Sequence, residues 1–211
     1  MKNIPQSGDY TASFNKFIYN EIPAESKCLD VGCWTGNLGK MLIAKKGCTV
    51  DGIDVNKSVL KSAKRNGYRS TYDINLNNDN YALEGIENNY DVIICADIIE
   101  HLINPERVLN ELKKKLSKNG IIIISLPNVA FLLNRLQLLF GKWNYREFGT
   151  LDKTHLKFFT VDSLIKLVTT ADFRIVKVKP YNQFGLLRYI EPLNKLLPKL
   201  FSYQILLVAR K

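Results

Sequence analysis

Short apolar runs alternate with amphipathic stretches along most of this chain, and the alternation predicts its strands and helices. Nearly continuous apolar runs predict strands at 26–32, 48–54, 68–74, 90–96, 121–127, 174–180 and 203–211. Apolar positions at helical spacing predict helices at 10–22, 37–47, 56–67, 104–120 and 160–173. Gly47 ends the second of these helices, and Asn104 with Pro105 begins the fourth.

Helices that alternate with strands buried on both faces indicate the α/β class. The pattern predicts a mostly parallel, seven-stranded sheet with helices on both faces, and the 211 residues fit a single domain, 1–211. In such sheets, ligands bind beyond the carboxyl ends of the strands, where the strand order reverses. The residues that follow the first four strands are therefore the first place to look for function.

Composition and charge narrow the class of protein. Residues 1–10 lack the apolar run of a signal peptide, and no apolar run is long enough to span a bilayer, so we expect a cytoplasmic protein. Residues 1–110 hold 12 Lys and Arg against 14 Asp and Glu, whereas 111–211 hold 18 against 6. A basic C-terminal half suits an anionic partner such as a phosphate-bearing substrate, nucleic acid or membrane surface, although surface lysines also serve simply to keep a protein solvated.

A glycine-rich turn, "LDVGCWTGNLG", follows the first strand and opens the next helix. Such a turn lets a ligand approach the backbone closely, and Asp54, at the end of the second strand, can accept the hydroxyls of a ribose. The spacing is not Gly-x-Gly-x-x-Gly, and Asp30 lies two positions before Gly32. A carboxylate there repels a pyrophosphate and suits a ligand that carries an ammonium group, which argues against a dinucleotide.

Together, "LDVGCWTG" with Asp54 resembles the cofactor motif of class I S-adenosylmethionine-dependent methyltransferases, and 90–128 is similar to the family's later motifs. The resemblance covers roughly residues 25–175 and extends to the methyltransferase type 11, 12 and 23 group. It implies a Rossmann-like fold, S-adenosyl-L-methionine as cofactor, a cofactor-binding half at about 25–127 and an acceptor-side half at about 128–211. The cofactor-binding residues that it implies are Asp30, Gly32, Cys33, Gly36, Asp54, Val55, Asp73, Ile74 and Ala96.

The stretch "ADIIEHL" after the fourth strand holds Asp97, Glu100 and His101, and a second histidine, His155, lies in "LDKTHLKFFT". These side chains suit a divalent cation, acid–base catalysis or the start of a helical turn. Their spacing resembles the Glu-x-x-Glu-His plus distant His of metal-dependent small-RNA 2′-O-methyltransferases and of ubiquinone-biosynthesis O-methyltransferases. Asp97 in place of the first Glu departs from that pattern, so metal dependence stays open.

Without a metal, His155 is the base expected to take the acceptor's proton, because imidazole titrates near neutral pH. Its segment resembles one in methyltransferases of bacterial surface-polysaccharide and lipid pathways, where Asp152 and His155 would lie at the acceptor mouth. The catalytic residues predicted are thus His155, Asp97 and Asp152. Two further segments, 128–149 and 184–201, combine apolar and basic residues and suit a lid, a membrane contact or a dimer interface.

The prediction is an S-adenosylmethionine-dependent O-methyltransferase that acts on a hydroxyl of a sugar, sugar nucleotide or glycan. Two alternatives stay open: metal-assisted methylation of a quinone, a lipid phenol or an RNA 2′-hydroxyl, and a non-catalytic methyltransferase-like partner subunit. No RNA-binding module is recognisable, so no nucleic-acid partner is expected. The sequence does not indicate an oligomeric state.

Overall fold

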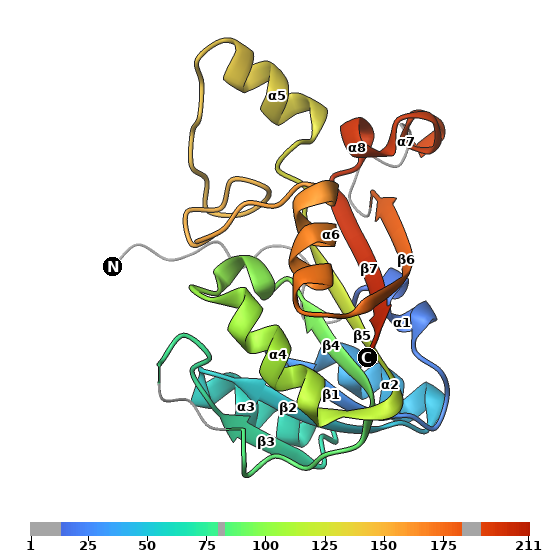
Figure 1. Cartoon of the computed structure of the whole chain (residues 1–211). Coiled ribbons are helices and arrows are strands. Elements are labelled where there is room, and N and C mark those ends of the chain that lie inside the picture. The colour runs from blue at the N-terminus through green and yellow to red at the C-terminus, as the bar shows by residue number, and fades with distance from the viewer. Residues whose placement is uncertain (1–13, 80–82, 183–190) are drawn as a thin grey trace.

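A computed structural model of the chain describes residues 14–79, 83–182 and 191–211, and shows one twisted sheet with helices packed on it (Figure 1). The strands are β1 (Lys27–Val31), β2 (Thr49–Asp54), β3 (Ser70–Asp73), β4 (Tyr90–Ala96), β5 (Leu116–Pro127), β6 (Arg174–Tyr181) and β7 (Gln204–Arg210). Their order is β3-β2-β1-β4-β5-β7-β6. Strands β1 to β5 pair in parallel, and β7 lies antiparallel to both β5 and β6. The predicted α/β class and mostly parallel seven-stranded sheet are confirmed.

Helices cover both faces of the sheet, as the sequence pattern predicts. They are α1 (Lys16–Glu21), α2 (Asn37–Lys46), α3 (Lys57–Arg65), α4 (Pro105–Lys115), α5 (Leu132–Leu139), α6 (Val161–Thr170), α7 (Glu191–Leu196) and α8 (Pro198–Phe201), with a 3₁₀ turn, η1, at Ile99–His101. One core lies between the sheet and α4 with α6, and the other between the sheet and α1, α2 and α3. Strand β4 supplies both cores, because Ile93 faces the first and Ile94 the second.

The fourth predicted helix is shorter than the sequence pattern suggests. The pattern predicts helix over 104–120, but α4 ends at Lys115 and Leu116 already pairs with Tyr90 as the first residue of β5. A side chain at Gly120 would meet the Tyr90 carbonyl at 2.8 Å, so the glycine lets the strands approach. Residues 116–120 have a local preference for helix, but their pairing with β4 is more favourable. Sequence periodicity cannot predict this outcome, because it contains no information on the pairing partner. Of the N-terminal helix predicted over 10–22, 16–21 is helical, and 10–13 lie outside the described residues.

The segment after β5 projects from the carboxyl end of the sheet, with α5 at the top of Figure 1 and α7 and α8 nearby at the same end. The sheet therefore ends in an extra layer on the side where its parallel strands finish. None of the helices in the described ranges combines the length and the hydrophobicity needed to cross a lipid bilayer.

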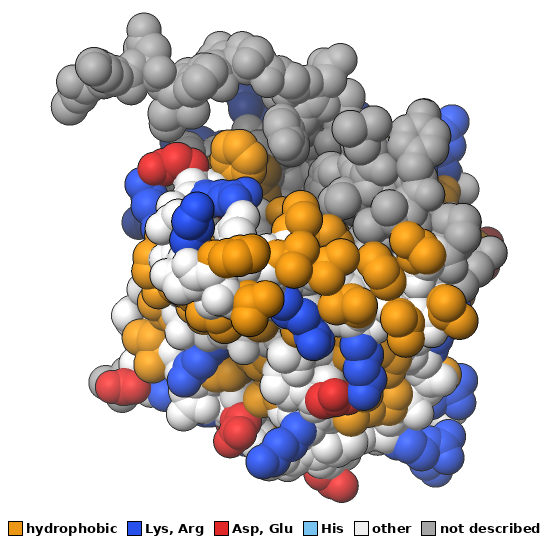
Figure 2. All heavy atoms as spheres, turned by 90° about the horizontal axis from the view of Figure 1, so that it is seen from above, with side chains coloured by type: hydrophobic (Ala, Val, Ile, Leu, Met, Phe, Trp, Pro, Cys, Tyr) orange, Lys and Arg blue, Asp and Glu red, His pale blue; other side chains and the backbone are white. Residues whose placement is uncertain are grey.

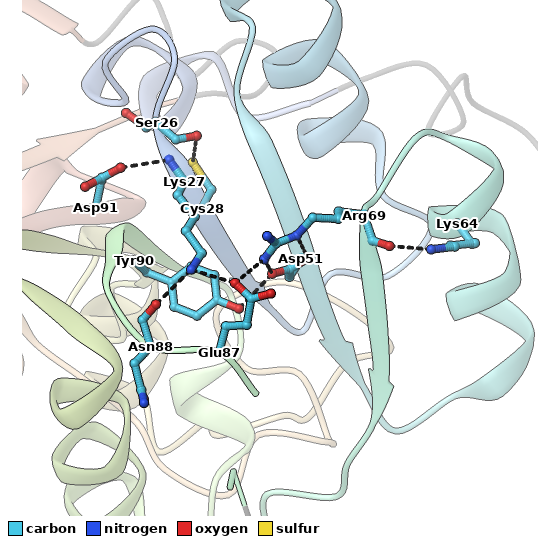
Figure 3. Close-up of polar contacts among 10 residues, drawn as sticks. All are labelled: Ser26, Lys27, Cys28, Asp51, Lys64, Arg69, Glu87, Asn88, Tyr90 and Asp91. Carbon is cyan, nitrogen blue, oxygen red and sulfur yellow. Dashed lines mark hydrogen bonds and ion pairs between the residues drawn. The ribbon is translucent and has the colours of Figure 1, made fainter. Parts of the chain in front are cut away.

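At the opposite end of the sheet, a polar network ties β2 to β3 and β4 (Figure 3). Asp51 is completely buried and accepts hydrogen bonds from Arg69 Nε at 3.0 Å and from the Tyr90 hydroxyl at 2.7 Å. Glu87 accepts from the same guanidinium at 3.0 Å and from Lys27 Nζ at 2.7 Å. Burial by itself would raise the pKa of Asp51, but the hydrogen bonds from Arg69 and Tyr90 outweigh it and hold the pKa below its ordinary value.

Replacing Asp51 with asparagine is expected to lower the free energy of unfolding by about 2 kcal/mol at neutral pH, less than the roughly 3–5 kcal/mol of a fully buried pair, because Arg69 still reaches solvent. Since the folded-state pKa is lowered, the stabilisation is complete above the unfolded-state pKa of about 3.9 and is lost as the pH falls through the folded-state pKa. Urea unfolding in steps toward acid should show the difference between the two proteins shrink. Glu87→Gln, at an exposed partner of the same arginine, is the control and should leave stability unchanged.

Candidate active site

The turn after β1 holds its backbone against β2 and leaves no room for a side chain at Gly32. Gly32 has φ +73°, and a Cβ there would lie 3.0 Å from the side chain of Ile98. The N–H groups of Gly32 and Cys33 both donate to the Ile53 carbonyl, at 2.8 and 3.0 Å. The turn is thereby fixed to the end of β2, with bare backbone at the point where a ligand would approach.

The other glycines of the motif accommodate a tyrosine ring. A Cβ on Gly36 would lie 2.8 Å from the ring of Tyr68, and a Cβ on Gly39 would lie 2.3 Å from it. The Tyr68 hydroxyl donates to the buried Asp30 carboxylate at 2.5 Å. Burial raises the pKa of Asp30 to about 6, although the Tyr68 hydrogen bond opposes this, and the charge of Asp54 adds to it. In the structure, Asp30 and Gly36 therefore contact Tyr68, which packs behind the turn, and do not face the ligand side.

A cavity of about 140 Å³ lies at the carboxyl ends of β1, β2 and β3. The predicted cofactor-binding residues that line it are Gly32, Asp54, Val55 and Ile74. The Asp54 carboxylate accepts the backbone N–H groups of Trp34 at 3.0 Å and Asn56 at 2.9 Å, one on each oxygen. Because a carboxylate oxygen has more than one acceptor position, Asp54 is held in place and can still accept hydrogen bonds from a ligand.

Other predicted cofactor-binding residues do not line this cavity in the described part of the chain. The Cys33 thiol packs in the core beside α2 and α3, and Asp30 and Gly36 lie beneath the turn. Asp73 forms an ion pair with Lys57 at 3.3 Å. Ala96 is half-buried and pairs in register with Ser125 of β5.

Asn75 and Asn77 line the cavity and were missed by the sequence analysis. Asn77 accepts the Ile103 N–H at 2.8 Å and donates to the His101 carbonyl at 2.9 Å, so it ties the segment after β3 to η1. The run "NLNN" directly after the third strand was the available signal, because it places amides at the ligand-binding edge. Apolar walls with an acidic acceptor at the end of β2 fit the nucleoside end of S-adenosylmethionine.

A buried carboxylate without partners lies beside the cavity. Glu100 is 2% exposed, and neither of its carboxylate oxygens has a hydrogen-bond partner among the described residues. Its Oε1 lies 3.9 Å from Nε2 of His155. Ligand atoms of Glu100, His101 and His155 all lie within 4.8 Å of one another. Burial, with added repulsion from Asp97, raises the pKa of Glu100 well above its ordinary range.

In His101 and in His155, the surroundings leave one ring nitrogen free to bind a cation or a proton. Nδ1 of His101 lies 3.2 Å from the Thr154 carbonyl, which can only accept, so the neutral form of His101 would carry its proton on Nδ1 and offer the Nε2 lone pair to a cation. Burial lowers the pKa of His155, and repulsion from His101 lowers it further against the opposing charge of Asp152. His155 is therefore neutral at neutral pH.

Long-range backbone bonds bring His155 to Glu100. The Glu100 carbonyl accepts the N–H groups of Leu156 at 2.9 Å and Lys157 at 3.0 Å. Asp152 Oδ1 accepts both the N–H and the hydroxyl of Thr154 at 2.7 Å, and these bonds lower the pKa of Asp152 against the effect of burial. Asp152 thus shapes the turn that presents His155, which is a positioning role.

Among the described residues, Asp97 is not part of the possible ligand group, although its charge acts on Glu100. It has φ +51°, its N–H donates to the Ser125 carbonyl at 2.9 Å, and the Ser125 hydroxyl lies 3.4 Å from its Oδ1. Asp97 is exposed as a residue, but burial of its carboxyl group raises the pKa to about 6, and hydrogen bonds from Gln204 and Ser125 oppose the rise. The structure therefore separates the predicted set into Glu100, His101 and His155 on one side and Asp97 on the other.

The donor set of the cluster fits a divalent cation. One carboxylate and two imidazoles suit Mn²⁺, Fe²⁺, Co²⁺ or Zn²⁺ better than Mg²⁺ or Ca²⁺, which prefer oxygen ligands. A buried carboxylate with both oxygens unpaired is costly unless something compensates its charge. His101 lines the cavity as well, so a cation held here would lie next to a ligand in it.

A family model described as a methyltransferase domain matches residues 8–178. The chain is similar to a ubiquinone biosynthesis O-methyltransferase of Rickettsia typhi, with 35% identity over 122 residues that cover 57% of this chain and 48% of the relative. The corresponding protein of Rickettsia akari is 28% identical over 163 residues, 76% of this chain and 64% of the relative. The matched region thus spans less than two thirds of either relative.

Solved structures share the fold at low identity. A SAM-dependent methyltransferase from Archaeoglobus fulgidus has a TM-score of 0.66 and 20% identity, covering 93% of this chain and 90% of that chain. An S-adenosylmethionine-dependent methyltransferase from Mesorhizobium loti also gives a TM-score of 0.66, at 15% identity, covering 93% and 96%. At these identities the similarity establishes the Rossmann-like fold.

Proposed function

Because the chain belongs to the class I S-adenosylmethionine-dependent methyltransferase family, we propose that it transfers the cofactor's methyl group to a phenolic oxygen of a quinone-type acceptor, assisted by a divalent cation. The observation that carries this proposal is Glu100, whose buried, unpartnered carboxylate lies with His101 and His155 at the wall of the cavity. The names of the relatives favour a quinone acceptor. The sugar or glycan acceptor expected from the His155 segment finds no support among them.

S-adenosylmethionine supplies an electrophilic methyl group on a positive sulfur. In the proposal, Asp54 binds the ribose hydroxyls, and the bare backbone at Gly32 lets the cofactor lie close to the turn. Ile74 provides an apolar surface beside it. The family's in-line displacement depends mainly on orientation, so the fixed turn and the anchored Asp54 do most of what the protein must do for the cofactor.

Glu100, His101 and His155 would hold the cation, which lowers the pKa of an acceptor hydroxyl. His101 is oriented for this by the bond between its Nδ1–H and the Thr154 carbonyl. Asp97, whose pKa is raised to about 6 by burial, directly precedes Ile98 of the cavity wall in the sequence and is the proposed proton acceptor. In the absence of a cation, neutral His155 is the alternative base.

The test follows label from methyl-labelled S-adenosylmethionine into defined acceptors. We expect labelling of catechol, a minimal phenolic acceptor, in the presence of Mn²⁺ or Zn²⁺, and a loss of labelling when a chelator is added. Sugar nucleotides should stay unlabelled. Label in sugar nucleotides but not in catechol would overturn the phenolic acceptor, and turnover that a chelator leaves unchanged would overturn the role of the cation. A protein that binds S-adenosylmethionine but labels no acceptor would favour a non-catalytic subunit.

A further inference from the structure

A second cavity lies between α4 and α6, apart from the one at the cofactor turn. Its volume is about 490 Å³, against about 140 Å³ for the first, and none of the described residues lines both. Its walls come from 103–106 at the start of α4, from 157–159 and from α6, and we call it the α4–α6 cavity. A space of this size is typical of sites that hold a small organic molecule. Neither the cofactor turn nor the proposed cation site makes use of it.

The walls of the α4–α6 cavity combine apolar surface with basic side chains. Phe159 and Leu167 belong to the core, at 8% and 7% exposed, and both also line the cavity. Lys157 lines it from the segment before α6 and Lys166 from α6 itself, and both lysines are exposed. Neither lysine forms an ion pair with another described residue. The cavity therefore offers one ligand both an apolar surface and two unpaired positive charges.

The charge around this cavity favours an anion. Glu106 is the one acidic side chain among the described residues that line it, and Asp162, at the start of α6, pairs with Lys199 at 2.7 Å. Figure 2 views the molecule from above and shows more Lys and Arg than Asp and Glu side chains on that face. An excess of positive charge raises the local concentration of anions. Because a phosphate monoester carries close to two negative charges at neutral pH, it matches two ammonium groups better than a carboxylate does.

Both walls of the α4–α6 cavity continue into the segments that carry the histidines of the cluster. On one wall, Lys157 follows His155 by two positions, and the ring of Phe158 lies 6.2 Å from the ring of His155. On the other wall, Ile103 follows His101 by two positions. A ligand in this cavity would therefore contact residues that adjoin both histidines.

We propose that the α4–α6 cavity is a ligand site for a small organic phosphate ester, separate from the site of methyl transfer. The apolar part of the ligand lies against Phe159 and Leu167, and Lys157 and Lys166 bind its phosphate. Because the ligand contacts Phe158, its binding changes the surroundings of His155. A neutral ring leaves the lysines without a counter-charge, and inorganic phosphate leaves the apolar surface in water, so neither binds as tightly.

The experiment measures binding of phenyl phosphate by isothermal titration calorimetry, on protein stripped of metal ions so that no bound cation can hold the phosphate. We expect a dissociation constant of about 1 mM or tighter, and binding at least about fivefold weaker for inorganic phosphate, phenylacetate and benzyl alcohol. Lys157→Met with Lys166→Met should weaken binding of phenyl phosphate about tenfold, because it removes both charges. Glu106→Gln should strengthen it about two- to threefold, because it removes a repelling charge.

The matched control removes two exposed charges on α2 and α3, Lys45→Met with Lys61→Met, and should change the dissociation constant by less than about twofold. Histidine-ring NMR at constant pH measures the contact with the cluster, since the chain has two histidines and both lie there. Phenyl phosphate should shift the ring signals of His155 in the wild type and in the control pair. In the Lys157→Met, Lys166→Met protein the same concentration should leave them unchanged.

Circular dichroism and the unfolding midpoint verify that each variant is folded. The proposal is overturned if the wild type does not bind phenyl phosphate, if the control pair weakens binding as much as the cavity pair, or if Glu106→Gln weakens it. Phenylacetate that binds as tightly as phenyl phosphate would overturn the phosphate class. Loss of binding on saturation with S-adenosylhomocysteine would place the probe in the cofactor cavity and overturn the separate site. The assay contains no acceptor and follows no methyl transfer, so its failure and the failure of the proposed function are distinguishable.

Discussion

Replacing Glu100 with glutamine is expected to lower methyl transfer by roughly 10²–10³-fold, because a cation that stabilises the reacting oxygen is worth several kcal/mol. Glutamine keeps the shape of the side chain but removes the charge that makes it a cation ligand. Addition of Mn²⁺ or Zn²⁺ should raise the unfolding midpoint of the wild type and leave that of the variant unchanged.

The stability of the Glu100→Gln protein in chelator separates a ligand from a structural residue. Both oxygens of Glu100 are buried without partners, so a neutral side chain should leave the midpoint unchanged or raise it. A lower midpoint, together with an undiminished response to the cation, would show that Glu100 serves the fold. Glu84→Gln, at an exposed carboxylate, is the matched control and should alter neither turnover nor stability.

Replacing Asp54 with asparagine is expected to raise the dissociation constant for S-adenosylmethionine about 10²-fold. The proposed ribose contacts are two hydrogen bonds to a charged acceptor, each worth roughly 1.5–3 kcal/mol, and an amide provides one weaker acceptor in their place. Isothermal titration calorimetry measures this directly. Part of the effect passes through the turn, because Asp54 also holds the Trp34 and Asn56 N–H groups.

Asp73→Asn is the matched control for Asp54→Asn, since it makes the same change at the end of the neighbouring strand. The Asp73 carboxylate pairs with Lys57 at the surface, so the affinity should stay within about threefold of the wild type. A large loss at Asp73 would instead restore it as the cofactor-binding residue that the family resemblance implies. Equal small effects at both positions would remove Asp54 from the ribose site.

Local patterns were sufficient to predict the order of strands and helices and the cofactor turn. A buried parallel strand must be apolar on both faces, and a turn with φ +73° beside another side chain must be glycine. Both requirements restrict the residue types at neighbouring positions of the sequence, so they can be recognised there. For this reason the parallel sheet, Gly32 at the turn and Asp54 at the end of the next strand were all predictable. The absence of a helix over 116–120 was not, because the pairing of Leu116 with Tyr90 of β4 decides it.

The tertiary structure decided which polar residues meet. The sequence placed Asp97, Glu100, His101 and His155 in one set. Backbone bonds from Leu156 and Lys157 to the Glu100 carbonyl bring His155 to Glu100 and His101, and Asp97 is not part of that cluster. Asp97, in a left-handed conformation after β4, lies instead beside Ser125 of β5. Likewise, Gly36 and Gly39 make room for Tyr68 of a distant segment. The sequence determines the chemistry available to each side chain. Long-range packing decides which other side chains it contacts, because those contacts are not encoded in the local periodicity.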